Sequence, residues 1–416
     1  MTAPTPQAQA TPISSDALDT PSTPAVPVPG ATLGLTAIFT STFFELVSHF
    51  MLMPLLLLRM KGADVSTTVA GLFAATGWLG IFVMTPFASS FAHLLGRRPA
   101  LWAAGAVLTA SALLFTLSDS LWVWFVLNLA SGIAMALRWV LAEALIAEFC
   151  PPEQRGRYVG FFQTLVSATF ITGPAALVWM GADNPHTLWV VVGFSALGLA
   201  WTALIPPVPE AHDADTAHVG LRGLWQALRA HPIIMLAGFV GGFFETGVTS
   251  ILPLYGLALG LGAGAAALLV SASGLGGVIV MLPAGMVADR FADQAQGRRT
   301  LMVFFAAVML TATCVLPFVA STAWLAWPIV FLWGGAGGTL YTLAMTDIGA
   351  REKGITLVNS TAVLVLNYTL GGLTASALSG ALIDWSPTVG FPLVLIAVAA
   401  LGLVALVYWR SPTRRG

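Results

Sequence analysis

The chain has 416 residues, of which 57% are hydrophobic and only 8% are charged, and its formal net charge is −1. Soluble domains carry about 25% charged residues, so this composition excludes an ordinary soluble enzyme. The near-zero charge provides no basic surface for nucleic acid. The two cysteines, Cys150 and Cys314, lack the spacing of a disulfide framework or a metal site.

Residues 1–32 form the first segment, which is rich in proline and threonine and contains no Lys or Arg. Such a segment cannot bury enough apolar surface to fold, so we expect a disordered N-terminal tail. It is not expected to be a signal peptide, because the basic start is missing and the apolar stretch that follows is long enough to span a bilayer.

Apolar stretches of about 20 residues, the length that crosses the hydrocarbon core, follow one another from residue 33. Only helices satisfy the backbone in lipid at this density, since barrel strands would be shorter and would alternate. The sequence therefore predicts an all-α membrane protein with about twelve spans. The spans are expected at 33–58, 66–88, 99–117, 121–147, 158–180, 187–205, 233–256, 264–287, 300–319, 324–349, 355–380 and 388–409.

Basic residues set the expected orientation. Fourteen lie in the breaks after even-numbered spans or at the C-terminus, whereas only Arg59 and Lys61 lie in breaks on the other side. Because Lys and Arg are retained in the cytoplasm, both termini are expected there.

The break at 206–232 is the longest within the apolar part, and it divides the spans six and six. We expect an N-terminal six-helix bundle at 33–205, a cytoplasmic linker at 206–232, a C-terminal bundle at 233–410 and a tail at 411–416. The two bundles repeat each other: Phe43-Phe44-Glu45 recurs 200 residues later as Phe243-Phe244-Glu245. Parallel repeats of this kind place a substrate site near the midplane between the halves.

The breaks after the second and eighth spans share a glycine- and arginine-rich pattern. The first ends in Gly96-Arg97-Arg98, and the second contains Gly285 and Asp289-Arg290. With these residues, the chain resembles the major facilitator superfamily across residues 33–410. The resemblance implies two pseudo-symmetric six-helix bundles, a monomer, and a loop at these residues that latches one conformation.

Gly173-Pro174 in the fifth span matches the centre of the family's antiporter motif, and this match favours export. The runs Trp139-x-x-x-Glu143 and Thr339-Leu340-Tyr341 are most similar to the YcaD-like subgroup and to drug:proton antiporter-like members. The family's fourth-span Arg is replaced here by Asn128.

Charged side chains inside a span are candidates for function, because they cost at least ~3 kcal/mol to insert. Glu45 lies midway along the first span, with His49 one turn further on. We expect Glu45 to load and unload a coupling proton while His49 tunes it. The alternative is a static hydrogen bond between the two side chains.

Glu245 is the repeat mate of Glu45, and Arg138 is the one basic residue inside a span. Glu245 can share the work with Glu45, one binding a cationic substrate and the other a proton. Arg138 is expected to pair with Glu45 or Glu245, because a lone buried guanidinium is costly. The pair can be a switch or only a structural support.

Weaker candidates are polar side chains elsewhere in the spans. Glu143 and Asp347 lie near cytoplasmic span ends, where gate salt bridges with loop arginines are expected. Uncharged groups that could line the cavity are Gln163, Asn359, Asn367 and Tyr368.

These features predict a secondary transporter of a small organic molecule that works by alternating access and exports its substrate by proton antiport. Proton-coupled uptake is the alternative, and an integral membrane enzyme or a non-transporting sensor is less favoured. No cofactor or metal is expected, since the proton gradient is the energy source. The expected location is the cell (inner or plasma) membrane, with the lipid bilayer and a small-molecule substrate as partners and no nucleic acid.

Overall fold

A computed structural model of the protein describes residues 30–150, 155–207, 221–288, 290–291, 294–352 and 354–408. Every regular element in these ranges is helical. Ten helices are long and apolar enough to cross a membrane, and shorter apolar helices at Thr164–Met180 and Thr187–Ala203 occupy the predicted fifth and sixth spans. The helical membrane fold is confirmed. The count of twelve spans and the side on which the termini lie stay predictions, and both predicted tails fall almost wholly outside the described residues.

The first half contains seven α-helices, one more than the predicted spans. The extra one is α3, a short helix that a 3-10 turn at Thr85–Phe87 joins to α2 and that ends at Gly96, whose φ of 80° breaks the helix. The helices are α1 (Ala31–Gly62), α2 (Thr67–Met84), α3 (Ala88–Leu95), α4 (Arg97–Leu117), α5 (Leu121–Phe149), α6 (Arg155–Met180) and α7 (Thr187–Ala203).

The second half repeats the order of the long helices, but the short helix α8 precedes its first span and no helix in its described residues matches α3. Its first span is divided into α9, a π-helical turn at Phe243–Val248, and α10. The helices are α8 (Leu221–Ala230), α9 (Pro232–Gly242), α10 (Thr249–Ala258), α11 (Ala263–Ala288), α12 (Gln294–Cys314), α13 (Ala326–Arg351), α14 (Gly354–Trp385) and α15 (Gly390–Tyr408).

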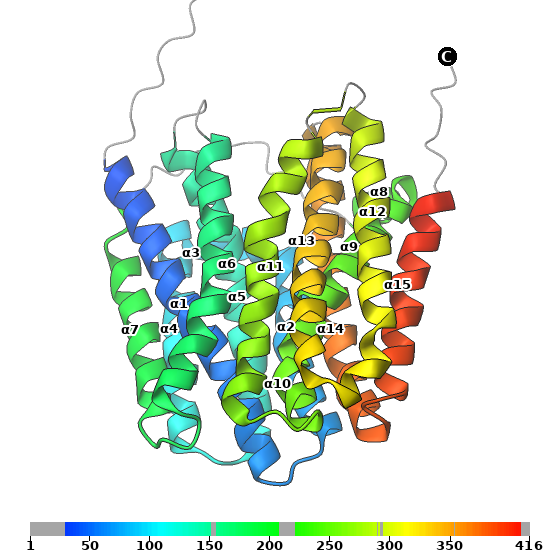
Figure 1. The fold of residues 1–416 in the computed structure, drawn as a ribbon. Coiled ribbons are helices and arrows are strands. Elements are labelled where there is room, and N and C mark those ends of the chain that lie inside the picture. The colour runs from blue at the N-terminus through cyan, green and yellow to red at the C-terminus, as the bar shows by residue number, and fades with distance from the viewer. Residues whose placement is uncertain are drawn as a thin grey trace, which may run out of the picture.

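The two halves stand side by side, with α1 beginning and α15 ending at the same end of the bundle (Figure 1). We call this the basic end, because α4 and α12 also begin there with Arg97-Arg98 and Arg298-Arg299. The other end, where α1 passes into α2, is the opposite end.

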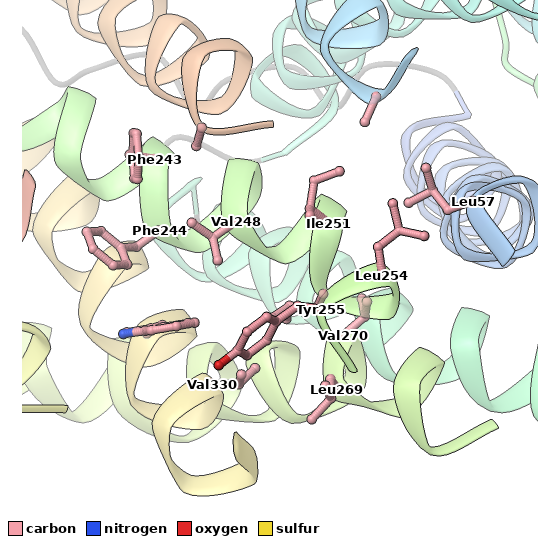
Figure 2. Close-up of a cluster of buried hydrophobic side chains, with 14 of the residues drawn as sticks. Leu57, Phe243, Phe244, Val248, Ile251, Leu254, Tyr255, Leu269, Val270 and Val330 are labelled. Atoms are coloured by element: carbon pink, nitrogen blue, oxygen red, sulfur yellow. The ribbon is translucent and has the colours of Figure 1, made fainter. Parts of the chain in front are cut away.

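The halves meet where α2 packs against α14 and α6 packs against α11. The α2 and α14 backbones touch, since a Cβ added to Gly71 would lie 2.7 Å from the carbonyl oxygen of Ser376 and 2.8 Å from the Cα of Gly380. The apolar core also crosses this boundary: Leu57 of α1 belongs to the same buried cluster as Ile251 and Leu254 of α10 (Figure 2). Small residues at helix contacts are the usual basis of association in membranes.

Candidate functional site

The charged centre of the first half is an ion pair between Arg138 of α5 and Glu45 of α1. Both residues are 3% exposed. Arg138 also donates from Nη2 to the Ser41 hydroxyl at 2.8 Å and from Nη1 to the Thr202 hydroxyl at 3.1 Å. Of the two partners expected for Arg138, the structure therefore shows Glu45.

Glycines of α4 and α7 make room for this pair. A Cβ on Gly198 would overlap Cγ of Glu45, and one on Gly105 would lie 3.1 Å from its Oε1 atom. Glu45 is thus enclosed by the first half's own helices. A cavity of about 10 Å³ borders the pair between α1, α5 and α6, which is room for about one water molecule and not for a substrate.

His49 does not join this network in the part of the chain that the structure describes. Its ring packs edge-on against Phe50, with the ring centroids 5.3 Å apart. The two positions share a helix face, as predicted, but the Glu45 carboxylate is held by Arg138. The tuning of Glu45 by His49 stays a prediction.

Glu245, the repeat mate of Glu45, has different surroundings. It lies inside the π-helical turn at Phe243–Val248 and is only partly buried. The Tyr368 hydroxyl of α14 donates to its Oε2 atom at 2.9 Å. Gly337 and Gly338 of α13 face it closely, since a Cβ on Gly338 would lie 2.8 Å from its Oε1 atom. No Lys or Arg in the described ranges pairs with Glu245, so its charge lacks the compensation that Arg138 gives to Glu45.

Aromatic residues surround Glu245 on one side and reach toward the first half. Tyr341 of α13 packs on Tyr368 with ring centroids 4.5 Å apart, and both are partly buried. Tyr341 interacts electrostatically with Glu245 and also with Glu143 of α5. We call Trp139, Glu143, Glu245, Tyr341 and Tyr368 the acidic aromatic cluster.

Glu143 belongs to this cluster and not to a salt bridge with a loop arginine, contrary to prediction. Its side chain is exposed, although it lies inside the span Leu121–Ile146. Its Oε1 atom accepts a hydrogen bond of 3.0 Å from the indole of Trp139, one turn earlier. No arginine binds it among the side chains that the structure describes.

Asp347 does form the expected ion pairs. It is 1% exposed, and its carboxylate accepts from Nε of Arg298 at 3.1 Å and from Nε of Arg351 at 2.7 Å. The first half has a matching pair between Arg97 and Glu148. The role of Asp347 as a gate residue stays a prediction.

Arg98 and Arg299 each bind the end of the last helix in their own half. Arg98 donates to the carbonyl of Ala203 at 3.0 Å, and Arg299 donates to that of Val407 at 3.2 Å. A cation at a helix C-terminus is favourable, because unpaired carbonyls and the helix dipole converge there. The repeated loop residues therefore fasten each bundle at the basic end.

At the opposite end, Asp384 of α14 connects the two halves. Its Oδ1 atom accepts from the backbone N–H of Thr67 at 3.0 Å. Its Oδ2 atom accepts from the N–H and from the hydroxyl of Thr68, both at 2.6 Å. These two threonines begin α2, whose free N–H groups and positive dipole end favour a carboxylate. This contact was not predicted from the sequence.

The remaining predicted residues lie outside the cluster. The side-chain amide of Asn367 donates to the carbonyl of Val363 in its own helix at 2.8 Å. Asn359 lies against Gly223 of α8. Gln163 lies on α6 at a position whose side chain is not described.

Most of the described residues of the antiporter-like and loop motifs lie at helix contacts or in open space. Gly173, next to Pro174, lets α6 approach α1, since its Cβ would lie 2.7 Å from Cβ of Phe50. Gly285 has open space around it, and Arg290 is exposed. Asp289 lies outside the described residues, so the latch expected of this loop stays a prediction.

The π-helical turn, Tyr341 and Asp384 were not predicted as functional features. The π-helical turn cannot be read from Phe243-Phe244-Glu245, because the same triplet in α1 is regular α-helix. Tyr341 is visible in sequence only as part of a subgroup resemblance. Asp384 has a usable signal, since it is a lone carboxylate at the end of a span.

The family follows from a comparison with known proteins. The sequence model described as Major Facilitator Superfamily matches residues 38–366. The chain belongs to the major facilitator superfamily. Membership makes it a membrane transporter and not an enzyme, as predicted.

Individual relatives agree with this membership. The transporter is 25% identical over 311 residues to YfkF of Bacillus subtilis (strain 168), an uncharacterized MFS-type transporter, covering 72% of this chain and 77% of that one. It is 24% identical over 334 residues to YcaD of Salmonella arizonae, of the same description, covering 79% and 83%. The predicted likeness to YcaD is thereby confirmed.

Solved structures share the fold. The nucleoside transporter NupG matches with a TM-score of 0.72 and 12% identity, over 90% of this chain and 99% of that one. A D-xylose-proton symporter matches with a TM-score of 0.73 and 15% identity, over 91% and 96%. At these identities the likeness concerns the fold alone.

Proposed function

We propose that the transporter moves a small organic molecule by alternating access in exchange for protons, with Glu245 as the proton carrier. The observation that carries the proposal is the contrast between the two repeat-related carboxylates. Glu45 is enclosed and paired with Arg138, whereas Glu245 is partly exposed and receives one hydrogen bond from neutral Tyr368. A carboxylate without a cation is costly in a membrane interior, so Glu245 needs a proton or a cationic ligand.

This assignment moves the proton from Glu45, the expected carrier, to its repeat mate. A proton that binds Glu45 must first break the ion pair with Arg138 and leave a guanidinium buried without its counterion. Glu245 has no such competitor among the described residues. The π-helical turn supports the same choice, since such turns occur frequently at functional sites.

Alternating access is supported by where the halves are joined. Asp384 binds the start of α2 at the opposite end, while exposed Glu143 gives the acidic aromatic cluster access toward the basic end. We infer from these two observations that the state described opens toward the basic end, which the basic residues predict to be cytoplasmic. Opening the other way requires Asp384 to release α2.

Export is the proposed direction, on the ground of the antiporter-like Gly173-Pro174 pair. Uptake by symport is the alternative, and the sign of the proton movement separates the two. In antiport, adding substrate to one side moves protons toward that side; in symport, protons move away with the substrate.

The test uses purified protein in liposomes that contain a pH-sensitive dye. A panel of cationic, neutral and anionic compounds is added to wild type, to Glu245→Gln and to Asp64→Asn, a control in an exposed loop. We expect substrate-dependent proton movement in wild type and in the control and none in Glu245→Gln. Full proton-driven transport by Glu245→Gln would refute Glu245 as the carrier.

A further inference from the structure

We propose that the acidic aromatic cluster recognises the positively charged end of an organic cation, which binds at Glu245 in place of the proton. The inference rests on the proposed function and adds the chemical class of the substrate. Two observations carry it: the charge of the cluster and its aromatic walls.

The charge of the cluster is negative and uncompensated. Glu245 and Glu143 both act on Tyr341, so the second half and the first half each contribute a carboxylate to one region. The guanidinium of Arg138, also on α5, is occupied by Glu45, Ser41 and Thr202. A bound anion would be repelled by the Glu245 carboxylate, which no Lys or Arg of the described ranges compensates, whereas a bound cation would supply the missing charge.

The walls of the cluster suit an ammonium group. Tyr341 and Tyr368 are in contact at 4.5 Å between ring centroids, and the Trp139 indole is tied to Glu143 at 3.0 Å. Aromatic faces attract a cation by about 0.5–2 kcal/mol each, and aromatic cages are a common way to bind alkylated ammonium groups. The Tyr368 hydroxyl, which donates to Glu245, fixes the carboxylate in place.

The exchange balances in charge. With the proton bound, Glu245 is neutral. A monovalent cation replaces the proton, and the Glu245 carboxylate becomes negative. The pair of Glu245 and the cation is then neutral, and one proton has been released. Binding should therefore weaken as the pH falls, because protons compete. The titratable groups beside Glu245 are Tyr368 from α14 and Tyr341 from α13, and Glu143 from α5 acts on Tyr341, while α9, α11 and α2 contribute none in their described residues.

Phenyltrimethylammonium is a suitable probe, since its charge is permanent and its size is that of one aromatic ring with one ammonium group. Benzyl alcohol and benzoate are the neutral and anionic comparisons. Binding is measured by equilibrium dialysis with detergent-solubilised protein, and proton release is measured in weakly buffered solution with an indicator dye.

We expect the cation to bind and to release about one proton from wild type, and neither comparison compound to do so. Glu245→Gln should lose proton release and weaken binding at least tenfold, with Asp64→Asn unchanged. Tyr341→Leu should weaken binding about 2- to 30-fold, whereas Tyr341→Phe, which keeps the ring, should bind like wild type. Equal binding by wild type and Glu245→Gln would overturn the inference.

The outcome also separates this inference from the proposed function. If benzyl alcohol or benzoate releases a proton through Glu245 while the cation does not bind, then Glu245 is the carrier and the cation site is refuted. If the cation binds without proton release and Glu245→Gln changes nothing, both the site and the carrier are refuted.

Discussion

Arg138 and Glu45 form a buried ion pair inside the first half, and the second half has no equivalent pair at Glu245 among its described residues. The duplication that produced two carboxylates 200 residues apart has therefore left them in unlike surroundings. Glu45 is held by the Arg138 side chain, whereas no Lys or Arg of the described residues holds Glu245.

Neutralising one member of the Arg138–Glu45 pair should destabilise the protein. Glu45→Gln or Arg138→Gln leaves one charge buried without its partner, which costs about 3–5 kcal/mol. The double variant Glu45→Gln/Arg138→Gln removes both charges and should recover most of that loss. Unfolding in detergent, followed by circular dichroism, measures the three free energies. Additive losses in the double variant would show that the two side chains do not interact.

Asp384→Asn should weaken closure at the opposite end. The carboxylate accepts three hydrogen bonds from Thr67 and Thr68, and an amide keeps one acceptor oxygen and loses the charge. Hydrogen bonds to charged groups are worth about 1.5–3 kcal/mol, so the open population at this end should rise several-fold or more. Spin labels on cysteines at positions 64 and 388, in a Cys314→Ala background, report the distance. An unchanged distance distribution would mean that Asp384 does not hold this end closed.

Gly71→Ala should act on the same end through packing. The added Cβ would lie 2.7 Å from the Ser376 carbonyl and 2.8 Å from the Cα of Gly380, so α2 and α14 must separate. Overpacking of this kind costs about 1–3 kcal/mol, here in the closed state. The same labels should show a longer mean distance. Gly193→Ala is the control, since no atom lies within 4 Å of its added Cβ, and it should leave the distance unchanged.

Glu352 gives a prediction about pH outside the membrane spans. A hydrogen bond with Nε2 of His231, at 2.6 Å, lowers the pKa of Glu352 below its ordinary value. A lowered carboxylate pKa stabilises the fold above the ordinary value of about 4.3, and this stabilisation is lost as the pH falls through the folded pKa. Glu352→Gln should therefore melt at a lower temperature than wild type at pH 7, with a free energy of unfolding lower by about 1 kcal/mol or less for this partly buried pair.

The gap between wild type and Glu352→Gln should close as the pH is lowered toward 3. Asp119→Asn, at an exposed carboxylate, is the control and should track wild type throughout. A gap that stays constant over this range would exclude ionisation of Glu352 as its cause.

Hydropathy predicted the positions of the long helices well, because lipid leaves a span few alternatives. Predicted and observed bounds agree closely for 121–147 against Leu121–Phe149 and for 264–287 against Ala263–Ala288. The short helix α3 was missed, because a polar break shows no span-length signal even where it is helical.

The site was predicted only in its parts. Because charged residues are rare inside spans, Glu45, Glu245 and Arg138 could be identified as candidates. Which carboxylate pairs with Arg138 depends on how α5 is rotated against α1, and the spacing of residues in the sequence does not reveal this rotation. Glu143 was expected to meet arginines at its depth. It binds Trp139 of its own helix instead and acts on Tyr341.

The most direct test of the account compares two charge removals under one imposed proton gradient. Glu45→Gln/Arg138→Gln and Glu245→Gln are reconstituted in liposomes, and uphill transport of a compound that exchanges with protons in wild type is measured. If Glu245 carries the proton, the double variant keeps proton-driven accumulation and Glu245→Gln loses it. Accumulation by Glu245→Gln together with its loss in the double variant would contradict the account and return the proton to Glu45.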